Sequence, residues 1–232
     1  MIQLVYSPNW FYGKDIAIDV ISIIVLALIG FFSIRSYNIK KNKNYLYLAL
    51  SFFLVSISFL FKILMNFEIY YHVVKTQQIG FLTITYQTMQ ESDMIFIIGF
   101  LLYRVLTLIG FYILYSIYQN QPRLNHILAV YLIIVLTYFS QSAYYIFHLT
   151  LAILITLITI VYSTKYLDKK NNTTKILAAS LAIIAISQIF FMLVNYNTQF
   201  YVIAEFTQLI GYLGVLTTFI MVLKHGRKKN KN

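Results

Sequence analysis

Seven apolar runs occupy most of the sequence, and each is close to the length that a helix needs to cross a lipid bilayer. They lie at 14–35, 45–66, 94–118, 127–143, 144–164, 175–195 and 200–223. A transmembrane helix requires about 20 mostly apolar residues. The runs therefore predict an all-α, polytopic membrane protein: a seven-helix bundle that forms a single transmembrane domain over residues 1–232.

The low proportion of charged residues supports lipid as the solvent of this chain. Only 11% of the residues are charged and 60% are hydrophobic, whereas a soluble domain carries about 25% charged residues. The chain has no cysteine, and its four histidines form no HExxH pattern. The sequence also lacks a recognisable nucleophile–base pair, metal-ligand cluster or phosphate-binding glycine loop. We predict that the protein is not an enzyme and holds no metal or cofactor.

Most of the basic residues fall on one side of the predicted bundle, in the loops and the C-terminal tail. Of the 18 basic residues, 14 lie there: Arg35, Lys40, Lys41, Lys43, Arg123, Lys165, Lys169, Lys170, Lys175, Lys224, Arg227, Lys228, Lys229 and Lys231. Cytoplasmic loops of membrane proteins carry this excess of lysine and arginine. We therefore predict a cell-membrane protein with its N-terminus outside and its C-terminus in the cytoplasm. Because the basic runs are short and scattered, anionic lipid headgroups are favoured over nucleic acid as their partner.

Two pairs of similar stretches predict an internal repeat. Moved by 129 positions, 48–67 lies on 177–196, and a second shift of 101 positions places 108–111 on 209–212. The first shift also aligns the preceding loops, so that Tyr37, Lys40, Lys41 and Asn42 fall on Tyr166, Lys169, Lys170 and Asn171. These registers predict a parallel 3+1+3 repeat about a pseudo-twofold axis along the membrane normal. The alternative is chance similarity between apolar helices.

The repeat divides the domain into two copies and a connector. The first copy covers about 12–118, the connector helix about 126–143 and the second copy about 144–224, followed by a basic cytoplasmic tail at 224–232. The two shifts differ by 28 positions, which places an insertion at 68–93 in the first copy. Within it, 81–86 alternates in a way that predicts an extracellular strand or hairpin. An extended helix followed by a loop is the equal alternative.

Four ionisable residues lie within the apolar runs, where an unpaired charge costs a few kcal/mol. They are Asp19, Lys62, Arg104 and Glu205. From a helical rise of about 1.5 Å per residue, all four reach one layer in the outer half of the bundle. The 101-position register superposes Arg104 on Glu205. We therefore expect these two residues to form an ion pair or to bracket one polar site.

Three further polar residues extend this layer. Asp19 superposes on His148, Gln188 lies in the outer half of 175–195, and Gln208 shares a helical face with Glu205. The candidate site, a ligand-binding or structural polar cluster, is Asp19, Lys62, Arg104, His148, Gln188, Glu205 and Gln208. An equally weighted alternative is a cluster that fixes helix register and binds nothing. Lys62 could instead reach the outer headgroups, and Asp15 is expected to be interfacial.

The arginine at position 104, the acid at position 205 and the predicted outside N-terminus resemble the plan of microbial rhodopsins. That resemblance implies seven helices in a 3+1+3 arrangement. It does not extend to the cofactor, because 201–223 holds no lysine for a retinal Schiff base. The sugar-carrier and PQ-loop families share the helix plan, but their proline–glutamine signatures are absent. The segment YVIAEFTQLIGYLGVLTTFIMVLKHGRKK also resembles uncharacterised archaeal-type seven-helix membrane proteins, a likeness that implies no function.

Three functions are compatible with this pattern. The first is a non-enzymatic, ligand-responsive or partner-binding module, with a small polar ligand in the outer half and a cytoplasmic protein partner. The alternative is a small-solute or ion transporter, although both prolines lie outside the predicted helices and no helix has the glycine or proline break that marks many transport sites. The third is a purely structural membrane scaffold. In each case the lipid bilayer is a partner.

Overall fold

The protein is all-α over the part of the chain that the structure, a computed structural model, describes: residues 7–75, 89–117, 122–140 and 143–229. Seven α-helices lie in these ranges: α1 (Lys14–Lys40), α2 (Lys43–Lys75), α3 (Met89–Ser116), α4 (Arg123–Phe139), α5 (Tyr144–Lys169), α6 (Asn172–Met192) and α7 (Gln199–Lys229). Two short 3₁₀ turns, η1 (Asn9–Phe11) and η2 (Leu193–Asn195), precede α1 and α7. The predicted fold class and helix number are confirmed at this level.

Six of the seven helices are long and apolar enough to cross a membrane, by length and composition. The exception is α4, whose 17 residues extend about 25 Å, against about 30 Å for the hydrocarbon core of a bilayer. Large apolar side chains lie exposed on the outer faces of the bundle, among them Phe31, Leu64, Ile153 and Ile210. Apolar residues on the outside of so many helices are typical of a protein that faces lipid.

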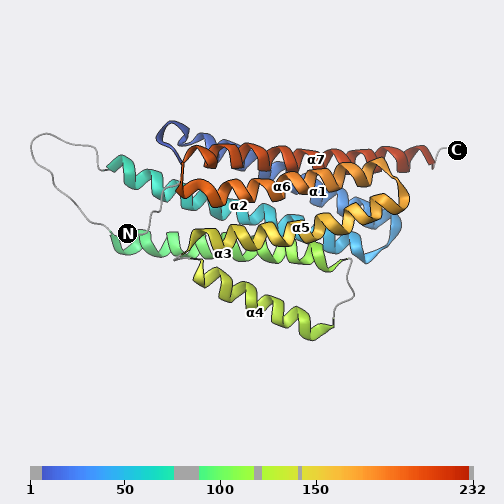
Figure 1. The fold of residues 1–232 in the computed structure, drawn as a ribbon, viewed down its shortest axis with the longest axis horizontal. Coiled ribbons are helices and arrows are strands. Elements are labelled where there is room, and N and C mark those ends of the chain that lie inside the picture. The colour runs from blue at the N-terminus through green and yellow to red at the C-terminus, as the bar shows by residue number, and fades with distance from the viewer. Residues whose placement is uncertain (1–6, 76–88, 118–121, 141–142, 230–232) are drawn as a thin grey trace, which may run out of the picture.

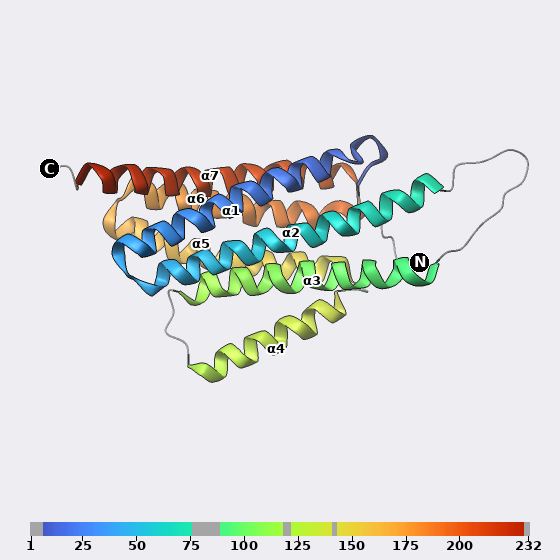
Figure 2. The same cartoon turned by 180° about the vertical axis from the view of Figure 1, so that it is seen from behind.

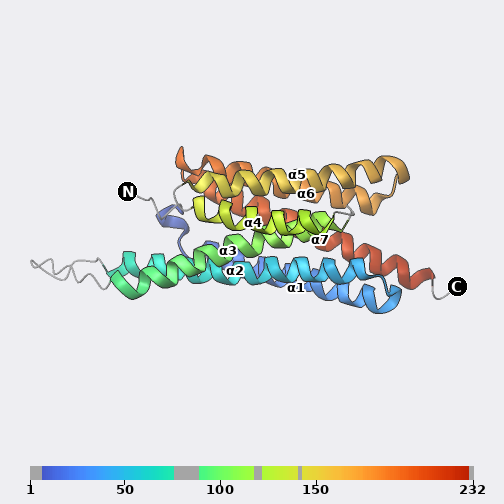
Figure 3. The same cartoon turned by 90° about the horizontal axis from the view of Figure 1, so that it is seen from below.

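Neighbouring helices pack in a closed cycle. Helix α1 packs on α2, α2 on α3, α3 on α5, α5 on α6, α6 on α7, and α7 again on α1. Helix α4 packs against α3 and α5 at the edge of the bundle (Figure 1 and, from behind, Figure 2). Seen from below, α5 and α6 form one side of the molecule, and α1 and α2 form the opposite side (Figure 3).

Small residues allow two of these helix pairs to approach closely. A Cβ atom on Gly110 of α3 would lie 2.6 Å from Val55 Cγ2 and 3.0 Å from the Ser51 carbonyl oxygen of α2. The Ser51 hydroxyl donates a hydrogen bond of 2.7 Å to the Gly110 carbonyl. A Cβ atom on Gly211 of α7 would meet Ile184 and would lie 3.1 Å from the Ser180 carbonyl oxygen of α6. Glycine is therefore required where α3 crosses α2 and where α7 crosses α6.

The turns that join α1 to α2 and α5 to α6 have the same backbone geometry. Lys41 and Lys170 adopt left-handed conformations, with φ of 53° and 49°. Their backbone N–H groups donate to the carbonyls of Tyr37 and Tyr166, both at 2.7 Å. A left-handed residue that bonds back to the last helical turn is a common way to end a helix. Both turns lie at the same end of the bundle as the C-terminal end of α7 (Figure 1).

The opposite end of the bundle carries η1 and the connection from α6 to α7 (Figure 1). A small apolar cluster lies there, formed by Phe11, Ile18, Phe191, Val194, Tyr201, Val202 and Ala204. A larger apolar cluster fills the rest of the interior. In the predicted insertion, α2 continues to Lys75 and α3 begins at Met89, as the extended-helix alternative expected for its first part. The predicted strand at 81–86 lies outside the described residues.

Candidate functional site

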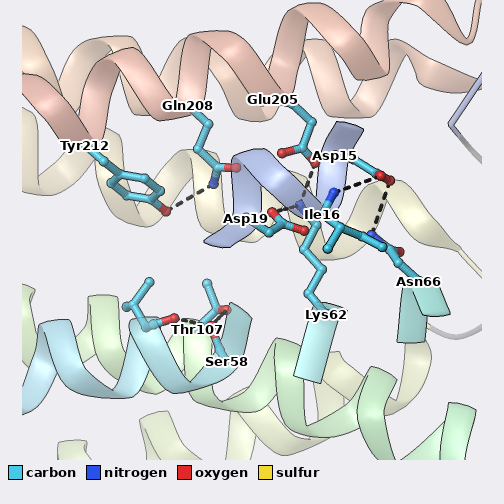
Figure 4. A network of polar contacts seen from close by, with 11 residues as sticks. Asp15, Ile16, Asp19, Ser58, Lys62, Asn66, Thr107, Glu205, Gln208 and Tyr212 are labelled. Carbon is cyan, nitrogen blue, oxygen red and sulfur yellow. Dashed lines mark hydrogen bonds and ion pairs between the residues drawn. The ribbon is translucent and has the colours of Figure 1, made fainter. Parts of the chain in front are cut away.

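Lys62 is the centre of a buried charged cluster near the η1 end of the bundle. Its ammonium nitrogen lies 2.7 Å from Asp19 Oδ1 on α1 and 2.5 Å from Glu205 Oε1 on α7. The exposed fraction of each of the three side chains is 6% or less. Figure 4 shows Lys62 rising from α2 between the two acids. The Lys62 side chain is buried and paired with two acids, an arrangement that does not favour the alternative in which it reaches the outer headgroups.

Asp15, which we expected to be interfacial, is buried and lies beside this cluster. Its exposed fraction is zero, and Asn66 donates to Asp15 Oδ2 at 3.4 Å (Figure 4). Asp15 precedes Asp19 by four residues and Asn66 follows Lys62 by four, so each pair lies on one face of its helix. That spacing is the signal that could have placed Asp15 in the cluster. We call Asp15, Asp19, Lys62, Asn66 and Glu205 the Lys62 cluster.

One oxygen of this cluster lacks a hydrogen bond. Asp19 Oδ2 is buried and has no hydrogen-bond partner among the described residues. Buried carboxylate oxygens are normally hydrogen-bonded, because an unsatisfied buried acceptor costs about 1–3 kcal/mol and more for a charged group. An exception in a native protein calls for an explanation such as a functional role, a water or an ion.

Two aromatic rings lie beside the ammonium group of Lys62. The ammonium group of Lys62 lies 5.2 Å from the centre of the Phe59 ring and 5.9 Å from that of Phe191. These distances are within the range of cation–π attraction. The Phe59 ring also packs edge-on against Tyr103 and Tyr212. The charged groups are therefore buried among aromatic side chains.

The remaining predicted residues lie around the Lys62 cluster and not in its ion pairs. His148 Nδ1 is 2.9 Å from Gln188 Oε1, and the His148 ring stacks on Phe191 with 4.8 Å between centres. Phe191 thus separates this pair from Lys62. Gln208 donates from Nε2 to the Tyr212 hydroxyl at 3.1 Å, one helical turn from Glu205 (Figure 4).

Arg104 is buried, but its contacts differ from those expected. It donates from its guanidinium group to the Ser140 carbonyl oxygen at 2.7 Å. Its guanidinium carbon lies 3.6 Å from the centre of the Phe100 ring and 5.1 Å from that of Phe147. Among the described residues, the ion pair of Glu205 is made with Lys62. Arg104 extends toward the connection between α4 and α5, and Lys62 provides the cation that we expected from Arg104.

Two carboxylates share one ammonium group in the Lys62 cluster. Asp19 and Glu205 share the single ammonium of Lys62, while Asp15 is bonded to the neutral amide of Asn66. Outside the membrane-spanning segments, burial raises the pKa of the Tyr12 hydroxyl, and the negative charge of Asp15 raises it further. Among the described residues, no group of three or more histidine, cysteine or acidic side chains could hold a metal ion.

Comparison of the chain with protein-family models, with curated proteins and with solved structures gave no match. The resemblances noted from the sequence therefore stay predictions, and the function has to be argued from the site.

Proposed function

We propose that this chain is a multi-pass cell-membrane protein without enzymatic activity, which binds a small polar ligand at the Lys62 cluster and responds to it. The observation that carries the proposal is Asp19 Oδ2, a buried carboxylate oxygen without a hydrogen-bond partner among the described residues. It lies within a cluster that joins three helices. A polar group that the protein does not satisfy itself is a place where a ligand gains binding energy.

The charge distribution supports an orientation with the η1 end outside. The turns of the basic end hold Lys40, Lys41, Lys43, Lys170 and Lys175, and α7 ends in a lysine-rich segment. By contrast, Asp15, Asp19 and Glu205 lie near the other end. An excess of lysine and arginine marks the cytoplasmic side, so the Lys62 cluster lies in the outer half and the basic end is available to a cytoplasmic partner.

Three pairs of equivalent contacts support the parallel 3+1+3 repeat. The 129-position shift relates the left-handed turns at Lys41 and Lys170. It also relates the hydrogen bond from Ser58 to the Val55 carbonyl and the one from Ser187 to the Ile184 carbonyl, both 2.7 Å. The close approach of Gly110 to Ser51 and Val55 corresponds to that of Gly211 to Ser180 and Ile184. Equivalent contacts at the same registers favour a repeat over chance similarity of apolar sequences.

The position of the Lys62 cluster gives a ligand a way to act on the bundle. Asp19 and Lys62 belong to the first three-helix copy, and Glu205 belongs to the second. A ligand that competes for the carboxylates of Asp19 or Glu205 would weaken a contact between the copies. The helices α1, α2 and α7, which the cluster joins, continue to the basic end. A change in their packing would thus be transmitted to the cytoplasmic side.

The single tryptophan provides a local test. Trp10 lies in η1, its ring is 5.4 Å from that of Phe11, and the Phe11 ring is 6.4 Å from that of Tyr201, one turn before Glu205. We expect the emission of Trp10 in purified protein to change saturably when a ligand binds. The probes are glycine as a zwitterion, methylammonium as an organic cation, glycerol as a neutral polyol, and simple salts.

A Trp10→Phe variant removes the tryptophan emission and controls for emission from other fluorophores. Asp19→Asn should weaken the response to a binding probe, whereas Asp168→Asn, an exposed acid at the basic end, should leave it unchanged. If no probe changes the emission of Trp10, or if the response is the same in Asp19→Asn, the proposal is wrong.

Transport is the second candidate, because transporters built from two repeats hold their substrate between the repeats, and the Lys62 cluster lies at that place. The test is uptake of the binding probe into liposomes that contain the protein. Uptake that disappears in Lys62→Met, but persists in the exposed Lys14→Met variant, would favour transport over binding alone. Binding without uptake would exclude transport.

A further inference from the structure

We propose that the ligand of the Lys62 cluster is one small monovalent cation, held at Asp19 Oδ2. The inference rests on the proposed function and names the class of ligand. Three observations lead to it: two carboxylates share one ammonium group, Asp19 Oδ2 has no hydrogen-bond partner among the described residues, and the three charged side chains are buried.

The charge of the ion-paired core requires one further positive charge. Asp19 and Glu205 both bond to Lys62, so two carboxylates are matched by one ammonium. A net charge inside the low-dielectric interior of a membrane protein is expensive unless it is paired. A single monovalent cation brings this pair of acids to neutrality.

The unsatisfied oxygen shows where that charge would lie. Asp19 Oδ1 accepts from Lys62, whereas Asp19 Oδ2 has no hydrogen-bond partner among the described residues. Both features point to the same atom: the second oxygen of Asp19 needs a partner, and the pair of acids needs a positive charge. A water molecule would provide the hydrogen bond but would leave the charge uncompensated.

The burial and the ligand set of the Lys62 cluster favour a small monovalent cation over larger or divalent ligands. The exposed fractions of Asp19, Lys62 and Glu205 lie between 0 and 6%, and the rings of Phe59 and Phe191 lie beside Lys62. A cluster this deeply buried favours a small ligand over a larger organic one. A divalent ion would require more acidic or histidine ligands than the described residues bring together. A sodium ion or a proton remains, and both supply one positive charge to a carboxylate oxygen.

The test compares the thermal unfolding of the purified protein in sodium chloride and in N-methylglucamine chloride at equal ionic strength, each over a range of pH. If sodium is the ligand, the unfolding temperature rises with sodium concentration and stays lower in N-methylglucamine. If a proton is the ligand, the two salts give the same curve and stability rises as the pH falls. Titratable groups around Asp19 that could contribute to this pH dependence are Asp15, Lys62, Tyr103, Tyr201 and Glu205.

Two variants decide whether the response belongs to this site. Asp19→Asn removes the proposed ligand oxygen, and Glu205→Gln leaves Lys62 paired with Asp19 alone, so both should abolish the cation response. Asp168→Asn makes the same change as Asp19→Asn at an exposed position and should retain the response. If either cluster variant folds and keeps the response, or if the unaltered protein responds to neither sodium nor pH, the inference is overturned.

These outcomes separate the inference from the proposed function. A change in Trp10 emission with glycine, methylammonium or glycerol, combined with no response to sodium or pH, would leave the proposed function standing and exclude a monovalent cation. An absence of response to every probe, sodium and protons included, would contradict both.

Discussion

Lys62 shows how a buried charge is stabilised in this protein. Its ammonium group is held by two carboxylates and lies near two aromatic rings. The sequence predicted Asp19, Lys62 and Glu205 as members of one layer, because depth along a helix follows from residue number. It did not predict which charges pair. Helix register places a Cα atom, whereas the direction of a long side chain such as Arg104 depends on neighbours from distant parts of the chain.

The contacts of Arg104 predict that lysine cannot replace it. Its planar guanidinium group stacks on Phe100 while donating to Ser140, and lysine lacks both the plane and the fixed donor geometry. We expect Arg104→Lys to lower the free energy of unfolding by about 1–3 kcal/mol, as for the loss of a buried charged hydrogen bond. Chemical or thermal unfolding in detergent measures this.

Arg35→Lys is the matched control, because Arg35 is exposed, and it should change stability by less than about 0.5 kcal/mol. Equal effects of the two substitutions would show that the buried contacts of Arg104 contribute no stability.

At the level of the helices, the apolar runs predicted where the elements lie. The run at 14–35 became α1 (Lys14–Lys40), and the run at 200–223 became α7 (Gln199–Lys229). These two helices extend past their apolar runs, because charged and polar residues continue a helix beyond the apolar part without interrupting its hydrogen bonds. The sequence did not predict that α4 packs on α3 and α5 at the edge of the bundle, since its apolar pattern resembles that of the others.

The close approach of α3 to α2 predicts a position-dependent effect of the same substitution. In Gly110→Ala the new methyl group would overlap Val55 and the Ser51 backbone, so α3 must shift. We expect a loss of about 1–3 kcal/mol, as measured for overpacked cores. Gly211→Ala should lower stability by a similar amount, because its new methyl group would meet Ile184 and Ser180 in the same way.

Gly99→Ala in the same helix is the control. A Cβ atom there would lie 3.5 Å from the nearest atom, the Phe61 carbonyl oxygen, which is an ordinary contact. This variant should unfold at or above the temperature of the unaltered protein, because alanine favours a helix over glycine by about 1 kcal/mol. If Gly110→Ala and Gly99→Ala behave alike, the helix crossing is not close.

For the whole molecule, the orientation in the membrane can be tested with single cysteines, since the chain has none. Tyr196 follows η2 at the proposed outer end and is 85% exposed, whereas Asn171 lies in the turn between α5 and α6. On intact cells, a membrane-impermeant maleimide should label Tyr196→Cys. Asn171→Cys should react only after the membrane is made permeable, and the opposite pattern would reverse the proposed orientation.

The central claim for the whole molecule is that Lys62 joins the two halves of the bundle through Glu205. A double-mutant cycle of Lys62→Met and Glu205→Gln tests it most directly. Removing one partner of a buried ion pair costs about 3–5 kcal/mol, because the other charge stays buried without compensation. We expect Lys62→Met to be strongly destabilised and the added Glu205→Gln to restore part of the loss. This would give a coupling energy of about 1–3 kcal/mol by thermal unfolding. Strictly additive effects of the two substitutions would contradict the account.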